Sequence, residues 1–526
     1  MKKFIAPLLV GAALSSAFAA DDLAKEVAAL KAQMAELQSA QSKMNVDALR
    51  AQVTEIKAHD AGDNIKWNVD FRTAYDIIDY KTQGGMGMVG VGAPGAGFPN
   101  GTPIMGNVPG QTISNGIWTN KLILGMGAQP ADNLVFKGAL GAYKTFGNNT
   151  SSAQNGFQGM DWYGTQAPSD STIKLREAYF LYFGDMGDVH YSASFGRRPS
   201  VDGFMTNLRA DNENPASPVG HNINMEFDGA SFKFDLDKVT GIAGMYFKIC
   251  LGRGNSDADA KYPGFTGYMG LGGLMPSYTS TPYAQSNADA PNMDLAGLLV
   301  QFYDNGQYKV MANYFQGWNM MGANFSGTTG NYDAALTDVG DLTGWSLSLQ
   351  VNGIGNGISD FLDDSIFFIS YAGSKTDPKG THGVINMDPF SGNLFGVEQV
   401  TEMLGSGKSE TGSSYYMGLQ LPGFMAGQRV GLEYNHGSKY WRSFTYGEDT
   451  LVGSKLATRG DAYEVYYTLP IVGKNLTAQL SYIYIDYDYT GSDMFFDSTG
   501  TPMDVDTTAG AVKTASNIRA SIRYRY

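Results

Sequence analysis

The sequence predicts an all-β fold, an antiparallel up-and-down transmembrane β-barrel of about 16 strands (roughly 14 to 18), preceded by a short periplasmic α-helical coiled coil. Three observations predict it. The chain opens with a secretory signal, apolar and polar residues alternate from Ile65 to the last residue, and the links between the alternating segments are short and long in turn. The predicted division is a signal peptide at 1–19, a coiled-coil helix at 20–60 and an outer-membrane barrel at 65–526.

The composition excludes several classes of protein. The net charge is −14, which argues against nucleic acid as a partner. Charged residues make up 17% and there are 67 glycines, whereas a soluble protein carries about 25% charged residues and about 7% glycine. A single cysteine, Cys250, excludes a disulfide framework and a thiolate metal centre. The five histidines are scattered, so no metal site and no cofactor are predicted.

The first segment predicts export. A basic start at Lys2 and Lys3 precedes an apolar stretch over 4–14, and small residues at Ala17 and Ala19 provide a cleavage site. The alternative is a membrane anchor, but this stretch is too short for a hydrocarbon core of about 30 Å. Cleavage after Ala19 removes Lys2 and Lys3 and takes the net charge from −14 to −16. No later run of 18 apolar residues occurs, so the mature chain is expected in the periplasm, in the medium or in the outer membrane.

A heptad pattern follows the signal. Apolar residues spaced four and three apart form the predicted seam of a coiled coil. The seam residues are Leu23, Val27, Leu30, Met34 and Leu37. We interpret it as a means of self-association, with a homotrimer as the expected assembly, and the alternative is a helix folded back on its own chain. Roughly 38 helical residues would reach about 57 Å, which would allow this stalk to contact the cell wall from the periplasm.

At Ile65 the period changes to 2, which is typical of a strand with one apolar face. Segments with this alternation recur through the rest of the chain. The predicted strands are 65–77, 113–129, 133–146, 172–184, 188–198, 226–237, 240–252, 293–303, 307–318, 342–352, 364–374, 411–421, 427–438, 460–469, 475–489 and 515–526. Further hairpins could lie within 253–292 and 375–410, so the count is uncertain by two.

The connections favour a barrel over a soluble β-sandwich. Long links rich in Gly, Asn, Ser and Asp cover 79–112, 147–171, 199–225, 253–292, 319–341, 375–410, 439–459 and 490–514, and shorter turns lie between them. A β-sandwich also has alternating strands, but it has no reason to sort its connections in this way. Long loops at one end and short turns at the other are typical of an outer-membrane barrel.

The last strand carries a further signal. Ile518, Ile522, Tyr524 and Tyr526 lie on one face and end on a terminal aromatic residue. The row resembles the C-terminal strand signal by which outer-membrane barrels are recognised for assembly. We therefore expect the chain in the outer membrane of a Gram-negative cell, in contact with lipid and lipopolysaccharide.

The inward faces of the predicted strands are rich in cations. Counting by parity gives fourteen basic positions, among them Arg72, against five acidic ones, while many acids such as Glu448 and Asp449 fall in loops. The candidate pore-lining residues are Lys121, Lys137, Arg198, Lys233, Lys248, Lys309, Arg429, Arg519, Arg523 and Arg525. Rings of Lys and Arg favour anions in a pore. The hypothesis is a porin, a water-filled diffusion channel for small hydrophilic solutes with a preference for anions. The alternative is that these cations pair with acids of loops folded into the lumen.

Two local features qualify this scheme. The segment 195–204 ends one strand and opens the third long loop, which by analogy with sixteen-stranded porins folds inward. Parity places Arg198 in the lumen and Arg197 at the rim. In strand 172–184, Glu177 falls on the apolar face, which a bulge or a position at the rim would explain.

The motifs GRRPSVDG (196–203), NKLILGMGAQPADNLVFKGALGAYKTFG (120–147) and REAYF (176–180) resemble the porin-like outer-membrane family catalogued as domain of unknown function 3373. The likeness is clearest over 110–230, and it departs from the family pattern at Ala139, where an Arg is expected. The resemblance implies a signal peptide, a periplasmic helix and a barrel, and it implies no substrate and no catalytic residues.

No GxSxG or HExxH motif is present, so an enzyme is not predicted. A TonB-type transporter would need a plug domain and about 22 strands. The competing hypothesis is a structural or adhesive surface barrel that uses its long extracellular loops and a stalk that faces the cell wall.

Overall fold

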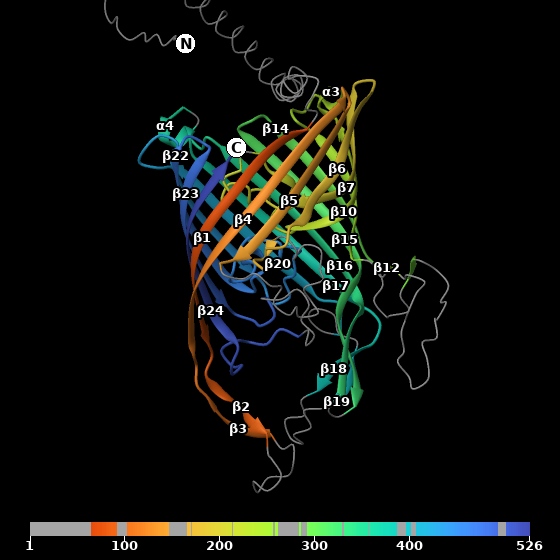
Figure 1. The fold of residues 1–526 in the computed structure, drawn as a ribbon, viewed down its shortest axis with the longest axis vertical. Coiled ribbons are helices and arrows are strands. Elements are labelled where there is room, and N and C mark those ends of the chain that lie inside the picture. Colours follow the sequence, from red (N-terminus) through yellow and green to blue (C-terminus); the bar gives the residue numbers. More distant parts are fainter. Residues whose placement is uncertain are drawn as a thin grey trace, which may run out of the picture. The chain divides into compact units, whose positions relative to one another are not determined.

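The computed structural model describes residues 65–91, 103–146, 166–169, 171–212, 214–255, 258–260, 283–285, 292–328, 331–355, 357–386, 396–400, 407–492 and 501–526 (Figure 1). The predicted signal peptide, the coiled-coil helix and its seam from Leu23 to Leu37 lie outside these residues. The chain divides into two compact units, Met1–Lys66 and Trp67–Tyr526. Within the described part of the chain, no helix is long and apolar enough to cross a membrane.

The described strands of the second unit form a closed antiparallel barrel of sixteen strands, each beside its neighbour in chain order (Figure 1). The strands are β1 (Lys66–Thr82), β4 (Thr112–Ala131), β5 (Leu134–Thr145), β6 (Lys174–Met186), β7 (Val189–Ser200), β10 (Met225–Asp235), β11 (Tyr246–Asn255), β14 (Met293–Asp304), β15 (Tyr308–Thr328), β16 (Asn331–Asn352), β17 (Ile366–Pro378), β20 (Thr411–Pro422), β21 (Arg429–Gly437), β22 (Gly460–Val472), β23 (Leu476–Tyr487) and β24 (Val512–Arg525). The predicted all-β barrel is confirmed.

Smaller elements lie in the connections and form separate two-stranded sheets. These sheets pair β2 (Gly85–Val91) with β3 (Pro103–Val108), β8 (Gly203–Phe204) with β9 (Ala216–Val219), β12 (Ala258–Ala260) with β13 (Tyr283–Gln285), and β18 (His382–Asn386) with β19 (Gly396–Val400). The short helices are α3 (Asp237–Thr240), α4 (Asp360–Asp363) and the 3-10 turn η2 (Lys455–Ala457). The hairpins anticipated within 253–292 and 375–410 are therefore present but do not join the barrel.

Two predicted boundaries are wrong. The strand predicted from residue 240 begins at Tyr246, because α3 occupies the preceding residues and ends at Gly241, whose φ of 70° is a left-handed cap. The predicted long loop 319–341 is instead the continuation of β15 and β16, which pair as far as Thr328 and Asn331. Gly and Asn residues interrupt the apolar–polar alternation in that stretch, so the sequence pattern does not reveal the full length of the two strands.

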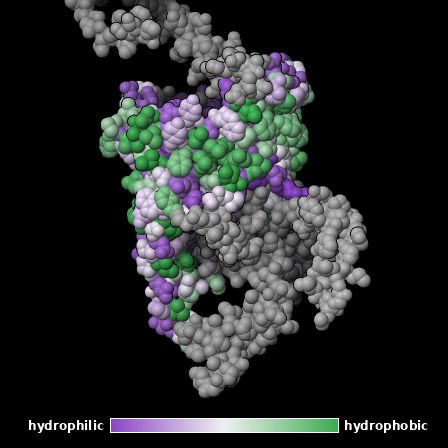
Figure 2. Space-filling view, viewed as in Figure 1, coloured by the Kyte–Doolittle hydropathy of each residue, from purple (hydrophilic) through white to green (hydrophobic). Residues whose placement is uncertain are grey.

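The outward face of the barrel is apolar, as the alternation predicted. On β16, Trp345 and Leu347 are 42% and 51% exposed, whereas Ser346 and Ser348, which alternate with them, are each 1% exposed. Hydrophobic side chains cover much of the barrel face seen in Figure 2. An exposed apolar surface on most strands is typical of a barrel whose outer surroundings are lipid.

The ambiguous strand, β6, changes face along its length. Leu175 near its start and Phe180 further on are both exposed on the outside, at 49% and 42%. They are five positions apart, which would place them on opposite faces of a regular strand. The pairing of β5 with β6 shifts between Ala139 and Leu140. The expected bulge is therefore present, and Glu177 lies on the same face as Tyr179, opposite Phe180.

The barrel closes by pairing β1 with β24. The register runs from Asp70 beside Arg525 to Ile77 beside Ile518 and beyond, and Tyr526 exchanges two backbone hydrogen bonds of 2.9 Å with Val69. The predicted C-terminal row is on the outside, where Ile518, Ile522, Tyr524 and Tyr526 are 42%, 48%, 43% and 78% exposed. Its role as an assembly signal stays a prediction.

Candidate functional site

Two connections fold into the barrel. The first inner loop, residues 201–224, joins β7 to β10, and the second inner loop, residues 438–459, joins β21 to β22. Side chains of the wall hold the first inner loop across the lumen, because Gln420 and Gln479 donate through Nε2 to the carbonyl oxygens of Leu208 (3.3 Å) and Arg209 (3.0 Å). The predicted inward fold of the loop after GRRPSVDG is therefore present, and a second loop joins it.

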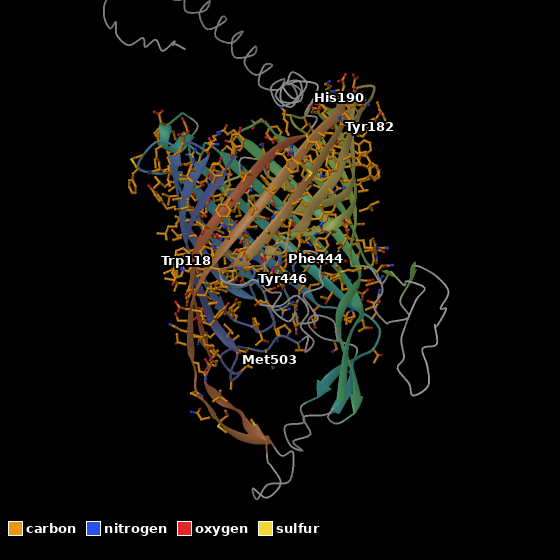
Figure 3. The ribbon with its side chains drawn as sticks, viewed as in Figure 1. Trp118, Tyr182, His190, Phe444, Tyr446 and Met503 are labelled. Atoms are coloured by element: carbon orange, nitrogen blue, oxygen red, sulfur yellow. The ribbon has the colours of Figure 1, made fainter. Side chains whose placement is uncertain are left out.

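The two inner loops are bonded to each other. The backbone N–H of Asn224 donates to the oxygen of Phe444 (2.6 Å), and the N–H of Phe444 donates to the oxygen of Asn222 (2.9 Å). The Arg209 guanidinium also forms an ion pair with Glu448. Figure 3 labels Phe444 and Tyr446 of the second inner loop against the barrel strands. The two segments therefore form one body within the lumen.

Apolar side chains fix this body to the wall. Phe444 packs on Phe315 of β15 with ring centroids 5.2 Å apart, and Val452 belongs to a cluster with Ile483 of β23. Leu456 belongs to a third cluster, with residues of the first inner loop and of four wall strands. The lumen is thus not uniformly polar: it carries apolar docking positions where the inner loops meet the wall.

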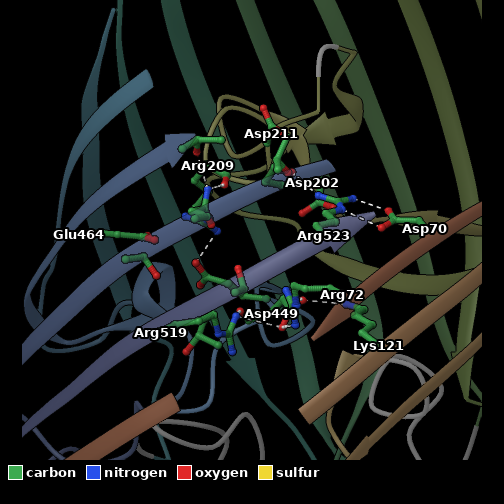
Figure 4. A pocket seen from close by; sticks show the side chains of 18 of the residues that line it. Asp70, Arg72, Lys121, Asp202, Arg209, Asp211, Asp449, Glu464, Arg519 and Arg523 are labelled. Carbon is green, nitrogen blue, oxygen red and sulfur yellow. Dashed lines mark hydrogen bonds and ion pairs between the residues drawn. The ribbon is translucent and has the colours of Figure 1, made fainter. Parts of the chain in front are cut away.

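One carboxylate of the second inner loop binds to several wall residues. Asp449 accepts from Arg72 at 2.8 and 3.1 Å, from Lys121 at 2.9 Å and from the hydroxyl of Tyr143 at 3.2 Å. Arg519 lies 3.4 Å from the same carboxylate and donates to the Asp449 backbone oxygen at 2.9 Å. Figure 4 shows Asp449 between Arg72 and Arg519.

The charge state of Asp449 follows from these partners. Burial by itself would raise the pKa of this carboxyl, but the charges of Arg72, Lys121 and Arg519 outweigh it and hold the pKa well below its usual value of 3.8. Asp449 is therefore ionised in any neutral medium.

A second ionic contact anchors the same loop. Lys455 is fully buried and forms ion pairs with Glu433 of β21 and Glu464 of β22. Glu433 also accepts from Arg209 at 3.2 Å and from the Tyr416 hydroxyl at 2.6 Å. Buried charges need such partners, because an unpaired ion in a desolvated site costs several kcal/mol.

The predicted position of Arg197 at the rim is wrong. Gly196 has a φ of 121°, and a Cβ there would collide with the carbonyl of Ala178. This turn of the backbone leaves Arg197 only 9% exposed, with its guanidinium 3.1 Å from Glu226. Arg176 lies 3.7 Å from the same carboxylate. The residue is paired inside the protein instead of facing solvent or lipid head groups.

The first inner loop also buries a histidine. His221 is fully buried and is hydrogen-bonded through Nδ1 to Ser370 of β17 (2.8 Å) and through Nε2 to Ser414 of β20 (2.9 Å). Burial lowers the pKa of His221 to about 3, so the ring is neutral at physiological pH. Its two hydrogen bonds link the first inner loop to β17 and β20.

The space left between the inner loops and the wall is a charged cavity of about 120 Å³ (Figure 4). Six basic and six acidic side chains line it. The wall contributes the basic residues Arg72, Lys121, Arg176, Arg519 and Arg523, and the inner loops contribute the acidic residues Asp202, Asp211, Glu448 and Asp449. Opposite charges thus face each other across the cavity, with the wall positive and the loops negative.

Most of the predicted pore-lining cations have partners in this interior. Lys121 and Arg519 bind Asp449, and Arg525 pairs with Asp211. Arg523 bonds Asp70 (2.7 Å), Lys233 pairs with Asp235 (2.6 Å) and Lys309 with Asp304 (2.9 Å).

Four other predicted cations also lie outside the cavity lining. Arg198 donates to the Ser231 hydroxyl at 2.6 Å and is 8% exposed. Lys137 is exposed, on the face of β5 opposite Phe136, and Lys248 and Arg429 are half-buried. The structure thus brings three predicted residues, Lys121, Arg519 and Arg523, into the lining of one cavity. Arg525 lies outside the lining but pairs with Asp211, which belongs to it.

Sequence reasoning missed the loop residues that complete the site. The sequence pattern places Glu448 and Asp449 in loops without showing that they face the wall, and it does not single out Arg209, His221 or Lys455. A signal was available, because the segment 439–459 contains Trp441 and Phe444, which are 1% and 2% exposed and would be unusual in a solvated loop.

Fold and interior together define a sixteen-stranded up-and-down β-barrel whose lumen is crossed by two of its own loops and retains a charged cavity. The chain belongs to the family described as protein of unknown function (DUF3373), whose model matches residues 112–526. The predicted family is confirmed. A comparison with curated proteins finds no match.

Solved structures with a similar fold include outer-membrane channels. The high-pH structure of Pseudomonas putida OprB is 10% identical, with a TM-score of 0.42, and the match covers 92% of this chain and 97% of that one. An anion-selective porin from Comamonas acidovorans is 10% identical, with a TM-score of 0.40 and coverage of 88% and 99%. The outer membrane channel DcaP of Acinetobacter baumannii is 12% identical, with a TM-score of 0.39 and coverage of 89% and 99%.

Proposed function

We propose that this chain is an outer-membrane porin that forms a narrow, water-filled passage for small hydrophilic solutes and has no enzymatic activity. The observation that carries the proposal is the charged cavity of about 120 Å³ between the inner loops and the wall. A barrel that served only as a scaffold would be more stable with an apolar or fully hydrogen-bonded interior, because buried polar groups without partners are destabilising. The apolar outer face supports a place in the membrane.

The charge arrangement supports a passage sensitive to charge. Five of the six basic residues of the cavity are on the wall, and four of the six acidic ones are on the inner loops. A field across the passage would orient a solute that carries both charges and would draw anions along the wall. Because the totals balance, we propose a weak preference for anions, which is less than the basic wall by itself would give.

Conductance of the refolded chain in a planar bilayer tests the function. The expected result is stepwise current of low conductance, since the inner loops fill much of the lumen, with an anion-sided reversal potential in a salt gradient. Steps grouped in threes would support the homotrimer that the predicted seam suggests.

The matched variants are Lys137→Glu and Lys81→Glu. Lys137 is exposed on the face of β5 opposite the outward Phe136, whereas Lys81 is exposed on the same face of β1 as the outward Ile77. Only Lys137→Glu should move the reversal potential toward cations. Cation preference in the unmodified chain would contradict the proposed anion preference but not the proposed channel function.

A second function is favoured by the two inner loops themselves. Both are held in the lumen by buried ion pairs, which is also what a closed barrel would need. A properly folded barrel that passes no current would contradict the channel. The surface barrel with structural or adhesive loops would then be the better proposal.

A further inference from the structure

The wall residues around Asp449 form a unit that does not depend on the loop. Arg72 lies on β1, Lys121 on β4, Tyr143 on β5 and Arg519 on β24, which follow one another around the barrel. Their backbones are fixed by the ladders of the sheet. Two loop groups bind them: the carboxylate of Asp449, and the side-chain oxygen of Gln166, which accepts from Lys121 at 2.9 Å. The wall therefore presents a preformed cluster of three cations and a hydroxyl.

The geometry is that of an oxyanion site. Arg72 addresses both carboxylate oxygens with its two terminal nitrogens, at 2.8 and 3.1 Å, which is the fork by which arginine holds carboxylates and phosphates. Lys121 and Tyr143 each add one bond to a carboxylate oxygen. Nothing in this donor set requires that the anion be part of the chain.

The cluster also holds more donors and charge than Asp449 uses. The nearby acid on the wall is Asp76, which accepts from Arg519 at 2.7 Å, so three cations face two carboxylates. Among the described residues, Arg72 Nε and Arg519 Nη2 have no hydrogen-bond partner, and the same holds for Nη1 of the buried Arg176 in the lining of the same cavity. A phosphate, with more acceptor oxygens than a carboxylate, would suit this surplus.

The cavity gives a solute access to the cluster. Arg72, Lys121, Arg519 and Asp449 all line it, and the Asp449 side chain keeps 22% of its surface exposed. Resting on the proposed function, we propose that Arg72, Lys121, Tyr143 and Arg519 bind the carboxylate or phosphate group of an anionic solute, and that Asp449 occupies this site while no solute is bound.

Calorimetric titration of the refolded full chain in detergent tests the site, with inorganic phosphate and acetate as separate probes. The chain should bind phosphate saturably. Asp449→Asn should lower the dissociation constant at least tenfold, because the competing charge is gone while the wall is intact. Lys121→Gln should raise it at least tenfold. Binding of phosphate but not acetate would assign the site to phosphate groups, and binding of both would assign it to oxyanions in general.

The control is Asp506→Asn, since Asp506, in the loop before β24, forms an exposed ion pair with Lys513 of that strand. The phosphate affinity of this variant should equal that of the unmodified chain. Equal affinities for the unmodified chain and Asp449→Asn would overturn the proposal. If Asp449→Asn does not fold, the Lys121→Gln comparison decides: saturable binding by the unmodified chain that this variant does not weaken would overturn it, as would no saturable binding by the unmodified chain.

The test separates this proposal from the proposed function, because calorimetry reads binding in a barrel that passes no current. A silent barrel that binds phosphate as expected would remove the channel and keep the site. A conducting barrel with equal affinities would keep the channel and remove the site.

Discussion

At the residue scale, the interior depends on ionised and polar groups whose partners come from distant parts of the chain. Asp449 contacts Arg72 and Arg519, which lie near opposite ends of the barrel sequence, and these cations outweigh the cost of burial and keep the Asp449 carboxylate charged. The acid-base behaviour of the molecule is therefore set by single residues of the inner loops.

His221 gives a prediction about acid stability. Its pKa is about 3 in the folded chain and about 6.5 when exposed, so below pH 6.5 the unfolded chain takes up a proton that the folded chain does not. The free energy of unfolding should then fall by about 1.4 kcal/mol per pH unit from this group. His221→Gln should be less stable by about 1 to 2 kcal/mol at pH 7.5 through its lost hydrogen bonds.

Urea unfolding at pH 7.5 and pH 4.5 measures this difference. The deficit of His221→Gln should vanish or reverse at pH 4.5. A deficit of the same size at both pH values would show that the histidine is protonated in the folded chain or does not titrate in this range.

At the element scale, the second inner loop is held by different forces along its length: Phe444 and Val452 by apolar contacts, Asp449 and Lys455 by ion pairs. The loop has its own small element, η2, whose Ser454 cap accepts from the N–H of Ala457. A segment fixed at four separate points behaves as part of the barrel core.

Lys455→Met tests the buried anchor. The change leaves Glu433 and Glu464 without their shared cation, and we expect a loss of about 3 to 5 kcal/mol in the free energy of unfolding. Adding Glu464→Gln should recover part of it. Lys513→Met, which removes an exposed partner of Asp506, is the control and should change stability by less than about 1 kcal/mol. A similarly small effect of Lys455→Met would mean that the anchor contributes little.

The same scale shows what sequence could predict. The sequence predicts the C-terminal end of β16 within a residue. Trp345 and Leu347 alternate with Ser346 and Ser348, and this alternation distinguishes the outward face of the strand from the inward face. The position of Asp449 could not be predicted, because an acidic loop residue has the same local pattern whether it faces solvent or a cationic wall. Such contacts depend on the conformation of the loop, and loops have no periodic sequence pattern from which it could be predicted.

At the scale of the whole molecule, closure joins residues that are far apart in sequence. β1 and β24 are linked by their ladder and by ion pairs of Asp70 with Arg523 and of Asp76 with Arg519. The alternation of long and short connections predicts an up-and-down barrel, but the ion pairs across the seam follow from the register of β1 and β24.

Removal of residues 523–526 tests the seam. The truncation deletes Arg523, the paired Arg525 and the two backbone bonds of Tyr526 to Val69. We expect the thermal midpoint of the heat-modifiable barrel band on gels to fall, because β1 gains an open edge where pairing was closed. Tyr526→Phe keeps the backbone bonds and should not lower it. An unchanged midpoint for the truncation would mean that the seam holds without the last residues.

The route of the second inner loop implies an order of events in assembly. Asp449 binds wall residues of β1, β4 and β24, while Lys455, six residues on, binds β21 and β22. The pocket for Asp449 exists only once the first and last strands have paired, so the Asp449 end of the loop has no binding site while the barrel is open, even where Lys455 has already bound β21 and β22. Its seating then marks the completed ring, and a chain that never closes would keep this segment accessible to proteases.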